Sequence, residues 1–244
     1  GNNDQDVWVS RRDSAGNFKK AENIGFPINN ESENFAISLT PDENLLLVGG
    51  VYLGGNKIGP GVSVSEFDGE DWSYPEALDI NNYYNFHPTA SYCLSSNGKV
   101  LLMSVMRKDS YGLNDLYVSF LKDDQTWSEP KNLGNVINTA DIELSPFLAS
   151  DGKTLYYSTS GKPGFGDTDM CRAKRLDNTW EKWSEPKNLG SKINTNGWDA
   201  YYTITAAGNY AYFASTNTEN KTADIFKIKL PQKSQPETIT LIQG

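Results

Sequence analysis

A short unit recurs along this chain at a nearly constant period. An aspartate followed by an apolar run begins at positions 6, 115, 169 and 224, and a weaker copy begins at Gly61, so the five starts are almost evenly spaced. Two further markers keep the same phase, a Trp-Ser-x-Pro segment at Trp72, Trp127 and Trp183 and an Ile-Asn-Asn or Ile-Asn-Thr segment at Ile28, Ile80, Ile137 and Ile193. Three markers in one order indicate a repeat protein.

Each repeat has the pattern of short strands. Two apolar runs flank Ser150-Asp-Gly-Lys153, which is a strong hairpin signal, and the same turn position recurs in the other repeats. A glycine-rich loop follows, then the aspartate-led third strand, and the Trp-Ser-x-Pro segment begins the fourth. Repeated four-stranded antiparallel units are typical of a β-propeller, in which each small sheet packs against its neighbours. We therefore expect an all-β propeller.

The repeat pattern also predicts how the strands are shared among blades. Residues 6–27 hold the third and fourth strands of one blade, three complete blades follow to about residue 190, and residues 198–230 hold strands one to three of another. This predicts 17 strands, with Thr238–Ile242 as a candidate eighteenth. We expect five blades, the first two strands lying before Gly1, because a four-bladed ring would leave the Asp224 strand redundant. Residues 1–230 form the propeller, and residues 231–244 form an exit linker or edge strand.

Composition excludes several classes of partner. The net charge of -9 and the pI near 4.7 give no electrostatic reason to bind nucleic acid or anionic lipid. No apolar run approaches the roughly 18 to 20 residues needed to cross a bilayer, so this domain is not expected to insert into a membrane. Cys93 and Cys171 lie at non-equivalent strand positions, and we expect both to be buried and unpaired. The chain starts inside a repeat, so its lack of a targeting signal is uninformative.

Two stretches carry a family resemblance. Ser-Pro-x-x-x-x-Asp-Gly-Lys-x-Leu-Tyr-Tyr-Ser at 145–158, with Gly-x-Gly-Asp-x-Asp at 164–169, resembles the TolB-type, WD-like propeller repeat. Trp-Ser-Glu-Pro-Lys-Asn-Leu-Gly-x-x-Ile-Asn-Thr at 127–139 and 183–195 resembles propellers of OmpA-family envelope proteins of Bacteroidetes-type bacteria. The resemblance covers about residues 1–244 and is weakest in the second repeat, where Gly61 replaces the aspartate. It implies an extracytoplasmic, peptidoglycan-associated protein in the periplasm or at the outer membrane.

Most of the repeated residues are interpreted as architecture. The tryptophans recur at one blade position and are expected to pack between blades. The aspartates begin third strands, where a short carboxylate can accept turn amides. The Asp151-Gly152 turn supplies a single carboxylate, far fewer oxygen ligands than calcium takes, so no metal site and no cofactor are predicted.

Residues that differ between repeats are better candidates for function. Loops between strands two and three, and those between blades, open on one face of a propeller. Here they are long, spanning 49–61, 104–114, 158–168 and 216–223, together with segment 81–89. The candidate partner- or ligand-binding residues of this face are Tyr52, Tyr83, Tyr84, His87, Arg107, Tyr111, Phe165 and Trp198. The alternative is that these aromatic side chains fold back and seal the tops of the blades.

A second candidate lies at the start of the innermost strands. Aligned hairpins make four polar residues equivalent at the mouth of the central channel, namely Asn34, Thr89, Glu143 and Asp199. Such a ring can hold waters, a cation or a ligand group, and structural water is the simpler interpretation.

Catalytic motifs are scarce, and the chain is predicted not to be an enzyme. His87 is the only histidine and has no matched nucleophile motif. The sequence therefore predicts a non-catalytic binding or scaffolding module that engages an envelope protein. A glycan- or cell-wall-binding module is the alternative. The enzymatic alternative is a propeller glycosidase that uses Glu143 and Asp199.

Overall fold

The computed structural model describes residues 5–205, 207–216, 222–232 and 235–236 of the 244-residue chain. These residues form 17 β-strands and no α-helix, which confirms the expected all-β class. Within these ranges there is accordingly no apolar helix of membrane-spanning length. The chain divides into two compact units between Asp79 and Ile80.

Unit 1, residues 1–79, contains a two-stranded and a four-stranded antiparallel sheet. The first pairs β1 (Trp8–Val9) with β2 (Glu22–Asn23). The second has the order β3 (Ala36–Leu39), β4 (Leu45–Leu53), β5 (Asn56–Glu66) and β6 (Glu76–Ala77). The buried apolar core of unit 1 includes Val7, Ile28, Leu46, Val48 and Tyr52. β1 and β2 match the third and fourth strands expected of the first repeat.

Unit 2, residues 80–244, contains three antiparallel sheets. The first has β7 (Ser91–Leu94), β8 (Val100–Val105), β9 (Asp115–Phe120) and β10 (Lys131–Asn132). The second has β11 (Glu143–Leu148), β12 (Thr154–Thr159), β13 (Asp169–Lys174) and β14 (Lys187–Asn188). The third has β15 (Asp199–Ile204), β16 (Tyr210–Thr216) and β17 (Ala223–Lys229).

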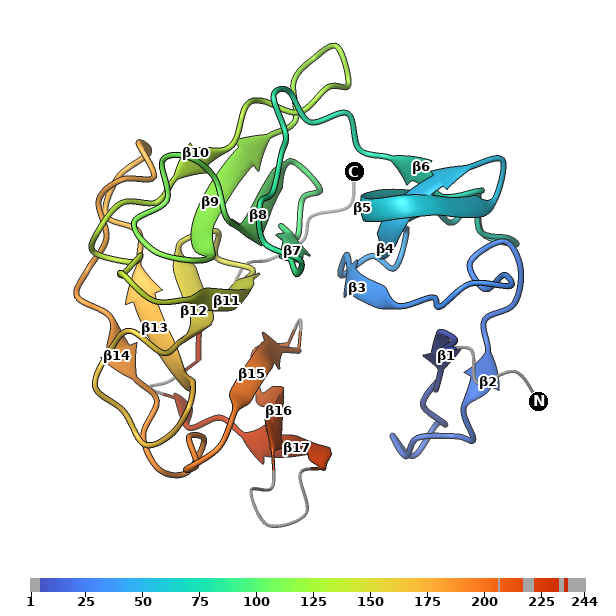
Figure 1. Ribbon diagram of the computed structural model, residues 1–244. Coiled ribbons are helices and arrows are strands. Elements are labelled where there is room, and N and C mark those ends of the chain that lie inside the picture. The colour runs from blue at the N-terminus through green and yellow to red at the C-terminus, as the bar shows by residue number, and fades with distance from the viewer. Residues whose placement is uncertain (1–4, 206, 217–221, 233–234, 237–244) are drawn as a thin grey trace. The chain divides into compact units, whose positions relative to one another are not determined.

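The three sheets of unit 2 are consecutive blades of a β-propeller. Their first strands are neighbours, since β11 contacts both β7 and β15, and the later strands of each sheet lie farther out (Figure 1). With the four-stranded sheet of unit 1, four blades are present in the described residues. The expected strand count is confirmed for these residues. The candidate strand at Thr238–Ile242, and with it most of the expected exit segment, lies outside them.

Local hydrogen bonds explain why the repeated turns fold as hairpins. Asp151 Oδ1 accepts the backbone N–H groups of Lys153 and Thr154, each at 2.8 Å, and Gly152 adopts a φ of 64°. The carboxylate thus satisfies amides that the tight turn leaves free, and the glycine supplies the left-handed residue.

The Trp-Ser-x-Pro motif fastens the outer edge of each complete blade in unit 2. The Ser128 hydroxyl accepts the N–H of Phe120 at 3.0 Å, and the Ser128 N–H donates to the Phe120 carbonyl at 2.8 Å. Ser184 makes the same two bonds to Lys174, at 2.9 and 2.8 Å. Trp127 and Trp183 are buried beside these serines, as expected of packing residues.

The Ile-Asn-Thr motif supplies a side-chain clamp on strand three. Asn138 Oδ1 accepts the N–H of Leu116 at 2.8 Å, while its Nδ2 donates to the Leu116 carbonyl at 3.0 Å. Asn194 clamps Met170 in the same way. The side-chain amide of each asparagine therefore binds the backbone groups of strand three that lie beyond the end of the short fourth strand.

The apolar core of unit 2 runs between its blades. One cluster joins the first two blades and includes Leu116, Leu133, Ile137, Leu155 and Tyr157. Cys93 and Cys171 belong to this cluster; both are buried and they form no disulfide with each other, as expected. Burial raises the pKa of the Cys171 thiol to about 11, with nearby carboxylates acting in the same direction.

The second repeat departs from the sequence analysis. The segment 49–61, expected to be a long loop, instead continues β4 and β5 as one hairpin that turns at Gly54 and Gly55. Both glycines have positive φ, 57° and 82°, which a two-residue hairpin turn requires. The extra length of this repeat is therefore strand.

Candidate functional site

Strands one and three of each blade in unit 2 begin at the same edge of their sheet, and the loops before β9, β11, β13 and β15 form a continuous surface. We call it the loop face and define it as residues 107–114, 139–142, 160–168 and 195–198. Backbone hydrogen bonds join these loops: Leu113 N–H donates to the Asp141 carbonyl at 2.8 Å, and Asp167 N–H donates to the Gly197 carbonyl at 3.0 Å. Gly161 packs against Thr139, which links the two pairs.

Two glycines permit the close approach of these loops. A Cβ at Gly112 would lie 2.4 Å from the carbonyl carbon of Ala140. A Cβ at Gly166 would lie 2.5 Å from the carbonyl oxygen of Gly197. Because the facing atoms are backbone, a larger residue would force the loops apart.

The strand-three aspartates hold the loop face from beneath. Asp115 Oδ2 accepts the Tyr111 N–H at 2.8 Å and Asn132 Nδ2 at 2.8 Å. Asp169 Oδ2 accepts the Phe165 N–H at 2.8 Å. Burial raises the pKa of Asp115 above its ordinary value, although these hydrogen bonds act in the opposite direction. The expectation that these aspartates accept turn amides is confirmed at both positions.

This arrangement places two aromatic side chains in solvent at equivalent positions. Tyr111 and Phe165 each lie four positions before the aspartate of their blade, and they are 55 % and 51 % exposed. Leu113 lies two residues after Tyr111 and is 47 % exposed. The loops that carry them are fixed by buried carboxylates and backbone bonds, so these side chains are presented by ordered structure.

The acids of the innermost strands are engaged in hydrogen bonds. Glu143 is fully buried and accepts the Thr139 N–H at 2.9 Å, the Thr139 hydroxyl at 2.8 Å and the Thr159 hydroxyl at 2.7 Å. Asp199, also fully buried, accepts the Thr195 N–H at 2.7 Å. Burial raises the pKa of Glu143, against the effect of its hydrogen bonds. Both carboxylates thus fix the Ile-Asn-Thr loops.

The other two residues aligned with these acids have different surroundings. Asn34, in unit 1, is buried, and its amide donates to the carbonyls of Asn30 and Ser32. Thr89 is exposed, and its hydroxyl contacts Nδ1 of His87 at 3.0 Å. The four positions are therefore equivalent in sequence but not in burial.

The loop before β7 carries an insertion. The stretch from Ile80 to Thr89 is longer than the matching stretch from Ile137 to Glu143. The inserted aromatic residues pack locally: Tyr83 and Tyr84 are half-buried, with the Tyr83 hydroxyl against that of Tyr92 and the Tyr84 ring 5.1 Å from that of Phe86. Phe86 itself is 59 % exposed.

Arg107 supports this loop from inside. The sequence predicts Arg107 on the binding surface, but the residue is only 5 % exposed. Its guanidinium lies 4.1 Å from the Tyr84 ring centroid and donates to the Asn82 carbonyl at 2.9 Å and to Glu129 Oε1 at 3.2 Å. A buried arginine that is paired and stacked in this way anchors a loop rather than meeting a partner.

Tyr52 is also removed from the predicted surface. It lies on β4 in unit 1, is 5 % exposed, and donates its hydroxyl hydrogen bond to Asn34 Oδ1 at 3.2 Å. Its placement on a loop was wrong because the segment that contains it is a strand.

Trp198 is half-buried and shares a contact that the sequence did not predict. Its ring meets that of Tyr201 edge-on, with centroids 5.5 Å apart. Tyr201 is 59 % exposed and has a φ of 56°, because the register of β15 against β16 shifts between Ala200 and Thr203. No sequence signal marked this bulge, although the pairing of β11 with β12 shifts similarly beside Ser145, whose φ is 49°.

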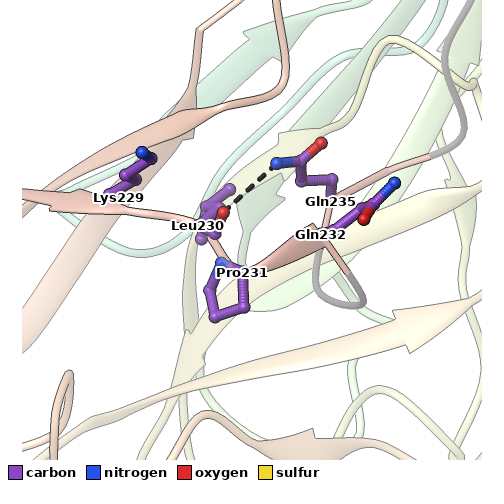
Figure 2. Close-up of a pocket in the computed structure, with 5 residues that line it drawn as sticks. All are labelled: Lys229, Leu230, Pro231, Gln232 and Gln235. Carbon is purple, nitrogen blue, oxygen red and sulfur yellow. Dashed lines mark hydrogen bonds between the residues drawn. The ribbon is translucent and has the colours of Figure 1, made fainter.

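The described part of the chain holds no metal-ligand cluster, and an open hollow in it lies away from these residues. Within the described ranges, no group of three or more His, Cys, Asp or Glu side chains could hold a metal ion. An open hollow of about 600 Å³ lies instead at the end of β17, lined by Lys229, Leu230, Pro231, Gln232 and Gln235 (Figure 2). None of the predicted site residues borders it.

Comparison with known proteins gives fold-level likenesses only. No protein-family model and no curated protein matches the chain. Among solved structures, a putative TolB from Agrobacterium tumefaciens aligns at 15 % identity over 86 % of this chain and 62 % of its own, with a TM-score of 0.48. TolB from Acinetobacter baumannii aligns at 16 % identity over 91 % and 47 %, with a TM-score of 0.45. A periplasmic gluconolactonase from Pseudomonas aeruginosa aligns at 12 % identity over 91 % and 78 %, with a TM-score of 0.41.

The chain thus spans less than two thirds of either TolB chain. Likenesses at these identities and TM-scores carry no conclusion about what this chain binds or whether it catalyses a reaction.

Proposed function

We propose that this chain is a non-catalytic binding module that engages a protein partner through the loop face of unit 2. The observation that carries the proposal is the exposure of Tyr111 and Phe165 at equivalent positions of consecutive blades. Aromatic side chains are enriched in protein interfaces and supply much of their binding energy. Because the supporting loops are already fixed by hydrogen bonds, little conformational entropy is lost on binding.

The state of the buried acids supports the non-catalytic part of the proposal. A glycosidase needs one carboxyl group to protonate the leaving group and another to act as base or nucleophile. Glu143 and Asp199 are fully buried, and their oxygens accept hydrogen bonds from the adjacent threonines. Carboxylates used in this way serve the fold.

The setting and the blade number are also part of the proposal. The Trp-Ser-Glu-Pro-Lys-Asn-Leu-Gly segments support an extracytoplasmic OmpA-family protein associated with peptidoglycan, in the periplasm or at the outer membrane. The repeat phase supports five blades. A structure of a longer chain with five sheets in one ring would support this count, and a closed four-bladed ring would contradict it.

The binding proposal is tested by immobilising three proteins on the same resin and comparing what each retains. The parent, a Tyr111→Ala/Phe165→Ala variant and a Leu176→Ala control are exposed to detergent-solubilised envelope and to soluble cell-wall fragments. Leu176 is 64 % exposed and lies between β13 and β14, at the sheet edge opposite the loop face, so it matches the exposed apolar character of the changed residues.

We expect one defined protein to be retained by the parent and by Leu176→Ala, and to be reduced at least about tenfold with the double variant, which corresponds to about 1.4 kcal/mol. Retention of glycan alone would replace the protein partner by a glycan. Equal retention by all three proteins would refute the loop face as the binding surface.

A further inference from the structure

The loop face carries a concentration of negative charge. The loop face and the strand starts beneath it contain seven carboxylates and three basic side chains, a net formal charge of -4, within residues 107–115, 139–143, 160–169 and 195–199. The whole 244-residue chain has a net charge of -9, so nearly half of it lies in this small part of the chain. Such a surface attracts a basic partner and repels an acidic one.

The basic side chains of this region compensate little of the charge at its surface. Arg107 is buried, and the Lys162 ammonium donates to a backbone carbonyl at 3.2 Å, so Lys108 is the exposed one of the three. Asp141 and Asp167 are both exposed, and neither belongs to an ion pair of the described residues. These two carboxylates are therefore open to a cation from a partner.

Each of these carboxylates comes from a residue beside one of the exposed rings. Asp167 follows Phe165 by two residues. Asp141 belongs to the neighbouring loop, and its carbonyl accepts the N–H of Leu113, two residues after Tyr111, at 2.8 Å. We call Tyr111 with Asp141, and Phe165 with Asp167, the ring–carboxylate pairs. The two pairs lie at equivalent junctions, because the N–H groups of Leu113 and Asp167 make matching bonds to the next loop.

A ring in unit 1 shows what the rings of the loop face lack. Phe18 is 56 % exposed and carries the guanidinium of Arg12 at 4.7 Å from its centroid. Tyr111 and Phe165 are about as exposed, yet no basic side chain of the described residues lies over either ring. A ring beside an unpaired carboxylate offers a cation both a cation–π contact and a charge-assisted hydrogen bond.

The buried carboxylate beneath the second pair has an oxygen to spare. Asp115 uses both oxygens, since its Oδ1 accepts the Gly112 N–H at 3.4 Å in addition to the bonds of Oδ2. Asp169 Oδ2 accepts the Phe165 N–H, but its buried Oδ1 has no hydrogen-bond partner among the described residues. A buried carboxylate oxygen without a partner adds to the negative potential under Phe165 and favours a positive charge nearby.

We propose that the protein bound by the loop face is basic, and that it places an arginine or lysine side chain on each ring–carboxylate pair. This inference rests on the proposed function and names the chemistry of its partner. The ring contacts the face of the cation while the carboxylate accepts its N–H groups, and an acidic or neutral side chain gains neither interaction. Because the pairs repeat on consecutive blades, one partner can engage both at once, and the two contacts reinforce each other.

The resin experiment separates this inference from the proposed function when two further proteins are added. Asp141→Asn/Asp167→Asn removes both charges and keeps both rings. The matched control is Asp123→Asn/Glu185→Gln, which removes two exposed charges from segments between strands three and four. We expect the first variant to retain the envelope protein at least about fivefold less than the parent, and the control to match the parent. Raising the salt from about 50 to about 300 mM should lower retention by the parent, because ion pairs are screened.

The outcomes of this comparison fall on different claims. Full retention by Asp141→Asn/Asp167→Asn, with loss by Tyr111→Ala/Phe165→Ala, would overturn the basic partner and leave the loop face as the binding surface. Equal retention by every variant would refute the loop face itself, and the inference with it.

A defined probe tests the same chemistry without the partner. Amide NMR spectra of the full 244-residue chain are recorded with N-acetylarginine amide and with the uncharged N-acetylglutamine amide. We expect only the arginine probe to shift the N–H resonances at positions 113 and 167, and these shifts to shrink at least about threefold in Asp141→Asn/Asp167→Asn. Equal shifts with both probes, or arginine shifts that this variant keeps in full, would overturn the proposal.

Discussion

At the scale of single residues, the loop face depends on buried carboxylates that accept hydrogen bonds from its loops. Glu143 takes three donors from Thr139 and Thr159, and Asp115 takes amides from the loop above it. Desolvation raises the pKa of both groups despite these bonds. The folded protein therefore holds a proton on each of them more tightly than the unfolded chain does.

This shift predicts a pH dependence for Glu143. An acid whose folded pKa lies above its ordinary value, 4.5 here, contributes stability that is fully present below that value and is lost as pH rises through the folded pKa. Urea unfolding at about pH 7.5 and about pH 5 should therefore show the parent gaining stability relative to Glu143→Gln as pH falls. The gain is at most about 1.4 kcal/mol for each unit of the pKa shift.

The comparison with Glu143→Gln cancels the background of the other acids, which are present in both proteins, and leaves the contribution of Glu143 together with its electrostatic coupling to Asp115. A constant difference in unfolding free energy between the two pH values would contradict the raised pKa of Glu143. A smaller parent advantage at the lower pH would reverse its sign.

The sequence predicts the loops that carry several of these residues, but the wrong burial for some of them. Tyr111 and Phe165 were found because they fall in the loops that precede the repeated aspartates, and both are exposed. Arg107 lies in such a loop as well, but it is buried. Its guanidinium packs on the ring of Tyr84, which belongs to an insertion present in a single repeat. Tyr201 was missed because its exposure comes from a bulge, which depends on pairing between strands rather than on a residue pattern.

At the scale of strands and loops, the asparagine clamp gives a physical reason for the repeated Ile-Asn-Thr motif, which the sequence shows only as a repeat marker. Asn138 binds both backbone groups of Leu116, and it is 2 % exposed. Asn81 occupies the same motif position in the second repeat, but its side chain is exposed. The motif residue is therefore buried at position 138 and exposed at position 81.

The two asparagines form a matched pair for mutation. Asn138→Ala leaves the buried N–H of Leu116 without its acceptor and should cost about 2 kcal/mol of unfolding free energy. Asn81→Ala removes an exposed side chain and should change stability by less than about 0.5 kcal/mol. Urea denaturation of both variants measures the difference. Equal losses would show that the motif acts through something other than this clamp.

Most strands could be predicted because hydrophobic period and turn chemistry agree in each repeat. The hairpin of β4 and β5 was the exception, since its glycines at 49, 50, 54, 55, 59 and 61 resemble a loop in composition. The Gly54-Gly55 pair was a readable turn signal, because a two-residue hairpin needs positive φ at both positions. Glycine content alone therefore predicts a loop here, whereas the position of the Gly54-Gly55 pair between two apolar runs fits the observed hairpin.

At the scale of the whole molecule, each unit has an apolar core built from its own residues. The core of unit 1 includes Ile28, Leu46 and Tyr52, whereas those of unit 2 draw on residues between Cys93 and Leu230. A compact unit with its own core can in principle fold without the rest of the chain. Repeat proteins also distribute their stability over contacts between neighbouring repeats, which here are complete among the three blades of unit 2.

We therefore expect a fragment of residues 80–244 to fold by itself. Its urea unfolding, followed by far-ultraviolet circular dichroism and tryptophan fluorescence, should show one cooperative transition with coincident midpoints. Asn138→Ala in the fragment should lower the unfolding free energy by the same amount, about 2 kcal/mol, as in the full chain, because both partners of the clamp lie within the fragment. A fragment that lacks a cooperative transition, or in which Asn138→Ala has no effect, would show that the core of unit 2 requires unit 1.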